Sequence, residues 1–185
     1  HNGELITAYY HSSGGGYTEN SENVWVTSVP YLRGVVDFDQ DSPRYKWEKR
    51  FSVAEFSEKL KNTGTDIGVL KSIELSKLTK QPVKAADRGV SGRVKTAKLT
   101  GTKGSGSFEG SKLRSVLGLD STLFEMKLVL VKDEQYVVIT GFGLGHGVGM
   151  SQWGAKAMAE KAKTKDYYQE ILRHYYKDTK IEKVY

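Results

Sequence analysis

The chain has no cysteine, three prolines and only four histidines among its 185 residues. Without cysteine there is no disulfide framework and no thiolate metal site, so the fold is indifferent to its redox compartment. No apolar run approaches the roughly 20 residues that a membrane-spanning helix needs, and no leader with a charged start and an apolar centre precedes the first strand-like run. These absences predict one soluble domain, residues 1–185, with a core of ordinary size.

Runs of charged residues of a single sign are also rare, and only one stretch has a clear excess of one sign. The formal net charge of +6 comes from 28 Lys and Arg against 22 Asp and Glu, which are mixed over most of the sequence. Residues 77–103 are different, because they are rich in lysine and arginine and contain one acid, Asp87. Such a stretch is typical of a surface for an anionic partner (nucleic acid, wall polymer or lipid headgroups) and equally of a solvated face.

The periodicity of apolar residues predicts an α+β fold of mostly antiparallel strands, with a basic β-rich middle section and helices concentrated at the C-terminus. The segment GELITAYYHSS (3–13) alternates and predicts a strand that begins almost at residue 1. Since a chain rarely starts inside an element, this opening suggests a fragment of a longer protein. Ser52 opens a Ser-x-x-Glu capping box and predicts a helix that ends at the Asn-Thr-Gly of residues 62–64.

The middle and end of the chain carry further element signals. Alternation within 67–103 predicts an antiparallel hairpin or sheet, and residues 63–108 a β-rich sub-lobe. Gly118 is expected to stop a short helix that starts at residue 110. Two strands joined at Lys-Asp-Glu-Gln (132–135) follow, and then helices over about 151–163 and 166–176.

Two segments set a histidine beside glycines, and both follow a predicted strand. They are YYHSSGGGYTEN (9–20) and GFGLGHGVGMSQ (141–152). If the two strands are neighbours, the segments form one polar site, because glycines let backbone approach a ligand closely. That site would contain His11, Ser12, Ser13, Thr18, Glu19, His146, Ser151 and Gln152. The alternative is that each glycine run only makes a tight turn and each histidine satisfies a local hydrogen bond.

Several chemistries lack their motifs. The 141–152 segment has neither the Gly-Lys-Ser/Thr of a phosphate loop nor a G-x-G-x-x-G fingerprint. No G-x-S-x-G elbow supports a serine hydrolase, and no H-E-x-x-H spacing supports a zinc hydrolase. Glycosidic cleavage needs a carboxyl that is protonated near neutral pH. Glu19 is the one carboxylate inside either segment.

Longer stretches carry a family resemblance. The segment GFGLGHGVGMSQWGAKAMAEKAKTKDYYQEILRHYY (141–176), together with AYYHSSGGGYTENSENVW (8–25) and VPYLRGVVD (29–37), closely resembles the stage II sporulation protein D family, which includes the amidase-enhancer proteins. The resemblance implies a peptidoglycan lytic transglycosylase without a cofactor. It cuts glycan strands whose stem peptides an amidase has removed, during engulfment of the forespore, and leaves a 1,6-anhydro sugar. It also implies an extracytoplasmic protein with an N-terminal membrane anchor.

The sequence departs from that family in two ways. The family's catalytic glutamate belongs to an N-terminal segment that has no counterpart here, so we expect this chain to be inactive alone and do not assign the role to Glu19. Some relatives bind a metal around the 9–20 segment through cysteine and histidine. Since cysteine is absent, we expect no structural zinc at His11.

The resemblance further implies partners and binding residues. We expect peptidoglycan glycan strands as substrate, a sporulation amidase and membrane proteins of the engulfment complex as partners, no nucleic acid, and an exchange dimer where an apolar groove is left open. Tyr45 and Lys46 join the eight residues named above as candidate substrate contacts. The competing hypothesis is a non-catalytic module that binds the cell wall or activates an amidase.

Overall fold

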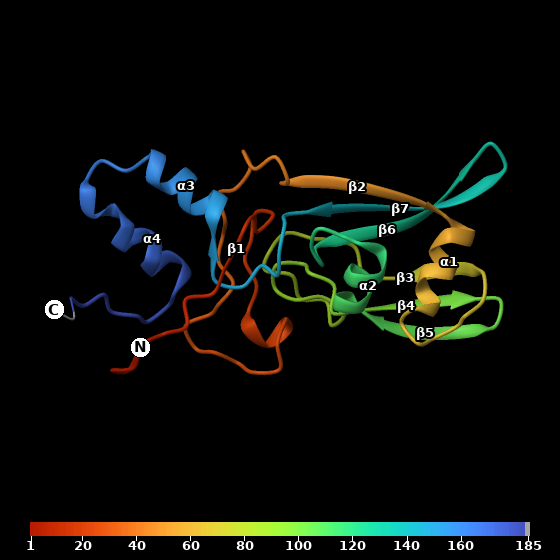
Figure 1. Ribbon diagram of the computed structural model, residues 1–185, viewed down its shortest axis with the longest axis horizontal. Coiled ribbons are helices and arrows are strands. Elements are labelled where there is room, and N and C mark those ends of the chain that lie inside the picture. Colours follow the sequence, from red (N-terminus) through yellow and green to blue (C-terminus); the bar gives the residue numbers. More distant parts are fainter. Residues whose placement is uncertain (184–185) are drawn as a thin grey trace. The chain divides into compact units, whose positions relative to one another are not determined.

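The computed structural model describes residues 1–183 (Figure 1). The chain divides into two compact units. The terminal unit contains residues 1–45 and the chain from Gly143 onward, and the central unit contains Lys46–Phe142. The β-rich sub-lobe predicted for residues 63–108 falls inside the central unit.

Two antiparallel sheets form the central unit. In the first, β7 (Glu134–Phe142) lies between β2 (Lys46–Ser52) and β6 (Phe124–Val131). In the second, β4 (Thr96–Gly101) lies between β3 (Leu70–Glu74) and β5 (Gly104–Glu109). The predicted antiparallel pairing of the basic middle section and the two strands joined near residue 132 are therefore confirmed.

Local signals in the sequence set the ends of the central helices. The Ser52 hydroxyl accepts a hydrogen bond from the Glu55 N–H at 3.1 Å and caps α1 (Val53–Lys61) as predicted. α2 (Gly110–Leu117) ends at Gly118, whose φ of 62° is the left-handed conformation that glycine adopts without strain. Both helices bury apolar residues in the core of this unit, which includes Phe56, Leu60, Leu99, Leu113 and Ile139.

The terminal unit contains little regular structure apart from its helices. β1 (Tyr10–His11) pairs in parallel with β8 (Met150–Ser151). A 3-10 turn, η1 (Ser21–Asn23), follows β1 in the chain. The unit has its own apolar core, which includes Leu32, Val35, Val148, Ile171 and Tyr175. The helices α3 (Gln152–Glu160), η2 (Lys165–Tyr167) and α4 (Tyr168–Tyr175) close the unit. An α+β fold with helices toward the C-terminus is thus confirmed.

The strand predicted for residues 3–13 is wrong in length, because only Tyr10 and His11 form a paired strand. The partner strand explains this. Gly149 has φ 73° and breaks the extended backbone before Met150, while Ser151 already caps α3. Two residues of partner strand cannot pair with eleven residues of alternating sequence. Residues 1–9 therefore lie without a strand partner, whatever their β-propensity.

No helix in the described part of the chain has the length and apolar character needed to cross a bilayer.

The core of the central unit predicts a large difference between two leucines. Leu99 in β4 is fully buried, whereas Leu130 near the β6–β7 turn is 64% exposed. Leu99→Ala should lower the free energy of unfolding by about 2–5 kcal/mol, because it removes buried methyl groups and leaves a cavity. Leu130→Ala, the same chemical change at the surface, should stay within about 0.5 kcal/mol of wild type. Urea unfolding of both variants is the measurement, and equal losses would contradict the placement of this core.

Candidate functional site

The two histidine-glycine segments lie side by side in the terminal unit. Besides the parallel pairs Tyr10–Met150 and His11–Ser151, isolated bridges join Ser13 to Leu144 and Glu19 to Val148. Their backbones exchange hydrogen bonds at several points, including both directions between Ser13 and Leu144, at 3.1 and 2.9 Å. The structure therefore brings together the segments that the sequence predicted would meet.

The glycines of the second segment are needed for this close approach. A Cβ on Gly143 would lie 2.5 Å from the Ser13 carbonyl oxygen, and one on Gly149 would lie 2.1 Å from the Tyr9 carbonyl oxygen. Both residues also have positive φ, 72° and 73°. Any side chain at these positions would push the first segment away and strain the backbone.

His11 and His146 face each other in the pair of segments. Their ring centroids are 5.5 Å apart, with the planes inclined by 56°. Val148 orients both rings, because its N–H donates to His146 Nδ1 at 3.1 Å and its carbonyl lies 3.2 Å from His11 Nδ1. This bonding assigns the proton to Nε2 in neutral His146 and to Nδ1 in His11.

Two aromatic side chains extend the histidine pair into a row. The Trp25 ring lies 5.3 Å from His146, and the Tyr9 ring lies 4.6 Å from Trp25, centroid to centroid. Tyr9 is 42% exposed, Trp25 and His146 are half-buried, and His11 is buried. We call Tyr9, Trp25, His146 and His11 the aromatic row. It presents ring surface that runs from solvent into the unit.

The predicted hydroxyl residues have structural partners. Ser13 Oγ donates to Asp39, Thr18 Oγ1 accepts from the Val35 N–H at 2.9 Å, and Ser151 Oγ caps α3 by accepting from the Gly154 N–H at 3.1 Å. All three side chains are buried. They hold the segments in place.

The remaining predicted residues differ in setting. Ser12 is half-buried and Gln152, the first residue of α3, is exposed. Burial raises the pKa of the half-buried Tyr45, and the negative charges of Asp39 and Asp37 raise it further. Lys46 begins β2 and belongs to the central unit.

Glu19, the carboxylate that the sequence placed beside the histidines, is fully buried. Its Oε1 accepts hydrogen bonds from the Asn20 N–H and from Asn23 Nδ2, both at 2.9 Å. The carboxylate thus fixes the backbone at the start of η1, and its geometry is that of a structural acceptor.

Two further carboxylates, Asp37 and Asp39, accept hydrogen bonds from residues 13–16 of the first segment. Asp39 accepts from the N–H groups of Gly15 and Gly16 at 2.8 and 2.9 Å as well as from Ser13. Asp37 accepts from the Gly14 N–H at 3.1 Å and from the Tyr175 hydroxyl at 2.7 Å. Each is only 1% exposed. The pair therefore defines the path of residues 13–16.

The burial of this pair was not predicted, because the local sequence gives no sign that the two acids point inward. Along Val-Val-Asp-Phe-Asp (35–39), exposure alternates so that both acids point inward while Val36 and Phe38 point outward. Alternation with acids on the apolar side is opposite to the usual pattern and indicates that the acids are held by buried donors. Trp25 was also missed, since nothing in its local sequence links it to His146.

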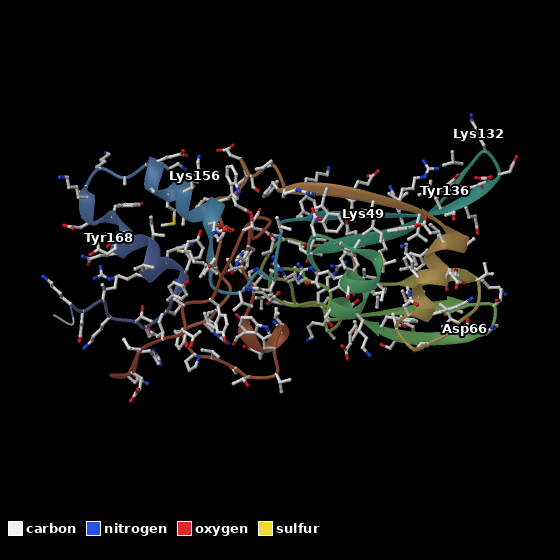
Figure 2. All side chains as sticks on the ribbon, in the orientation of Figure 1. Lys49, Asp66, Lys132, Tyr136, Lys156 and Tyr168 are labelled. Atoms are coloured by element: carbon white, nitrogen blue, oxygen red, sulfur yellow. The ribbon has the colours of Figure 1, made fainter. Side chains whose placement is uncertain are left out.

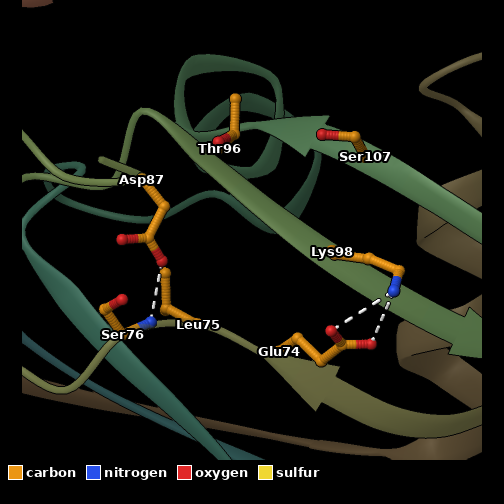
Figure 3. Close-up of a pocket in the computed structure, with 7 residues that line it drawn as sticks. All are labelled: Glu74, Leu75, Ser76, Asp87, Thr96, Lys98 and Ser107. Atoms are coloured by element: carbon orange, nitrogen blue, oxygen red, sulfur yellow. Dashed lines mark hydrogen bonds and ion pairs between the residues drawn. The ribbon is translucent and has the colours of Figure 1, made fainter. Parts of the chain in front are cut away.

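The central unit contains a separate polar depression (Figure 3). It has a volume of about 450 Å³ and is lined by Glu74, Leu75, Ser76, Asp87, Thr96, Lys98 and Ser107. None of the ten predicted substrate contacts lines it. Across residues 1–183, no group of three or more His, Asp or Glu side chains is arranged to hold a metal ion.

The chain matches one family model and several curated proteins. The model of the family described as Domain of unknown function (DUF8618) matches residues 31–149. Stage II sporulation protein D of Bacillus subtilis (strain 168) is 36% identical over 182 residues, 98% of this chain and 46% of that protein. The protein of the same name from Bacillus amyloliquefaciens is 36% identical over 177 residues, 95% of this chain and 45% of its own length.

A second kind of relative is similar over the same region. The Amidase enhancer of Bacillus subtilis (strain 168) is 34% identical over 220 residues, which cover 98% of this chain and 30% of that protein. The chain thus spans less than half the length of the curated relatives it matches.

The buried carboxylate pair predicts a specific pH dependence. Burial raises the pKa of Asp37, and the charge of Asp39 raises it further. Between the ordinary aspartate pKa of about 3.9 and this raised value, the folded state holds a proton that the unfolded chain has released. The free energy of unfolding should therefore fall as pH rises through that window. Asp37→Asn removes this contribution, so its stability should fall less steeply.

Urea unfolding of wild type and Asp37→Asn between about pH 4 and pH 8 tests this prediction. Asp41→Asn is the matched control, because Asp41 is exposed on the same segment. The control should follow the wild-type profile. Parallel profiles for wild type and Asp37→Asn would contradict the prediction.

Proposed function

Because the chain belongs to the stage II sporulation protein D family, we propose that its terminal unit binds the glycan strands of bacterial peptidoglycan during sporulation. The substrate class is glycan from which an amidase has removed the stem peptides, and the full activity is that of a lytic transglycosylase outside the cytoplasm. The observation that carries the proposal is the aromatic row. Three of its side chains come from residues 9–25 and the fourth is His146, all within the terminal unit.

The row has the chemistry that a sugar ring requires. Aromatic faces pack against the apolar faces of sugars, while polar groups at the edges bind their hydroxyls. Tyr9 and Trp25 supply the faces, and the imidazole of His146, oriented by the Val148 N–H, supplies a polar edge. The half-buried Ser12 and the exposed Gln152 add polar groups from the paired segments.

Lytic transglycosylation needs one carboxyl in two roles. The acid first protonates the glycosidic oxygen as the bond to C1 breaks, and its carboxylate then takes the proton of the sugar's own 6-hydroxyl as that oxygen bonds to C1. Glu19, Asp37 and Asp39 are each at most 1% exposed and already accept backbone N–H groups. We therefore assign the general acid to none of them, and propose that a segment outside these 185 residues supplies it.

A non-catalytic function is the second candidate. The same burial of all three carboxylates favours it, and a relative named Amidase enhancer is 34% identical over 98% of the chain. In that case the terminal unit binds denuded glycan and promotes the action of an amidase. Products separate the two candidates, since only a transglycosylase leaves 1,6-anhydro-muramyl ends.

Tyr9 offers a test of the aromatic row with a matched control. Tyr9→Ala should weaken binding to amidase-treated glycan strands about two- to tenfold, because one aromatic face is lost. Tyr168→Ala is the same change at a tyrosine of similar exposure, 51% against 42%, on α4 of the same unit (Figure 2). It should bind like wild type in a co-sedimentation or titration assay. An equal loss in both variants would refute the assignment.

The catalytic part of the proposal has its own measurement. Purified glycan strands are incubated with this chain and with the same chain extended by the upstream segment of a longer relative, and the products are read by mass spectrometry. Anhydro-muramyl ends should come from the extended protein alone. If this chain itself produces them, the exclusion of Glu19 is wrong and Glu19→Gln becomes the next variant. If neither produces them, the non-catalytic function stands.

A further inference from the structure

The central unit carries exposed lysines whose charges are not neutralised. Lys77, Lys80 and Lys84 lie on the connection between β3 and β4, and none of the three forms an ion pair with any residue in 1–183. By contrast, Lys98 pairs with Glu74 at 3.0 Å and Lys103 pairs with Asp66 at 2.5 Å. Apart from Lys95, the exposed basic side chains of residues 77–103 that form no ion pair all lie within residues 77–84, which we call the lysine loop.

Two acids accept hydrogen bonds from the backbone at the start of the lysine loop. Asp87 Oδ2 accepts from the Ser76 N–H at 2.7 Å (Figure 3), and Glu125 Oε1 accepts from the Leu78 N–H at 3.0 Å. Each carboxylate thus shapes the loop rather than pairing with one of its lysines. The positive charge of the three lysines faces solvent.

A buried arginine fixes the base of the loop. The Arg88 side chain is 3% exposed and donates to the carbonyl oxygens of Ser76, Gly92 and Phe124 at 2.7, 2.6 and 3.0 Å. The Val83 N–H also donates to the Val90 carbonyl at 2.8 Å. These bonds hold the two ends and the middle of the connection. The lysines consequently project from an ordered backbone, which reduces the entropy lost when a ligand binds them.

We propose that the lysine loop binds a linear polymer of phosphodiesters through Lys77, Lys80 and Lys84. Seven residue steps separate the first lysine from the last, so they span at most about 25 Å of extended chain, enough to contact several phosphates of one strand. Lysine ammonium groups act as point charges that suit phosphates without demanding a fixed geometry. This surface belongs to the central unit and is independent of the glycan-binding function proposed above.

The composition of the loop favours a polymer without bases. Residues 77–95 contain no aromatic side chain on which a base could stack. Their two arginines, Arg88 and Arg93, are buried, so neither can read a guanine edge. A membrane surface is disfavoured as well, because none of the exposed large apolar side chains lies in this loop.

The test uses synthetic poly(glycerol phosphate) as the probe and the intact chain as the protein. Combining Lys77→Gln, Lys80→Gln and Lys84→Gln should weaken binding about tenfold or more at low salt. The slope of log affinity against log salt should become shallower by about two to three, because fewer counterions are released. Binding of denuded glycan strands by the terminal unit should not change in this variant.

A second triple variant removes the same charge from other places in the central unit. Lys61→Gln, Lys112→Gln and Lys132→Gln alter exposed lysines of α1, α2 and the β6–β7 turn (Figure 2 labels Lys132). It should bind the probe within about twofold of wild type. An equal loss in both triple variants would overturn the proposal in favour of diffuse charge. Tighter binding of duplex DNA, or binding of phosphatidylglycerol vesicles alone, would overturn it in favour of another partner.

Discussion

The arrangement of the terminal unit depends on two buried carboxylates, Asp37 and Asp39. Together they accept hydrogen bonds from three successive backbone N–H groups, Gly14 to Gly16, and from Ser13 and Tyr175. Each lost partner would leave a buried charge or a buried donor unsatisfied, which costs far more than an exposed hydrogen bond contributes. Residue 154 beside this pair must be glycine, because a Cβ there would lie 1.8 Å from an Asp37 oxygen. The turn at residues 13–16 is thus determined by donors and acceptors more than by apolar packing.

The aromatic row follows from that turn. With residues 13–16 fixed, the first segment enters its parallel pairing with β8 at His11, and the positive-φ glycines of the second segment let the two backbones come together. Val148 then orients both histidine rings through its own N–H and carbonyl groups. The side chains that face a ligand are therefore positioned by backbone geometry, and the chemistry of the row is a consequence of where glycine is placed.

Local features of the fold could be predicted from the sequence, whereas long-range features could be predicted only in part. The Ser52 cap, the Gly118 stop and the turn near Lys132 each depend on a few neighbouring residues, so their patterns sufficed. The opening strand failed because its length is set by Gly149, more than a hundred residues away. The meeting of the histidine segments was predicted from their composition. The burial of Asp37 and the contact of Trp25 with His146 were not predicted, because both depend on how the whole unit folds.

The point at which the chain leaves the terminal unit lies next to the point at which it returns. The Gly143 N–H donates to the Tyr45 carbonyl at 2.9 Å, and 97 residues, 46–142, separate the two. The entropic cost of closing so long a segment exceeds that of closing a ten-residue loop by about 2 kcal/mol. Within the central unit, however, Lys46 and Phe142 are register partners on β2 and β7. A central unit that folds first already holds the two chain ends together, so the folding of one unit supplies the loop closure on which the histidine segments of the other depend.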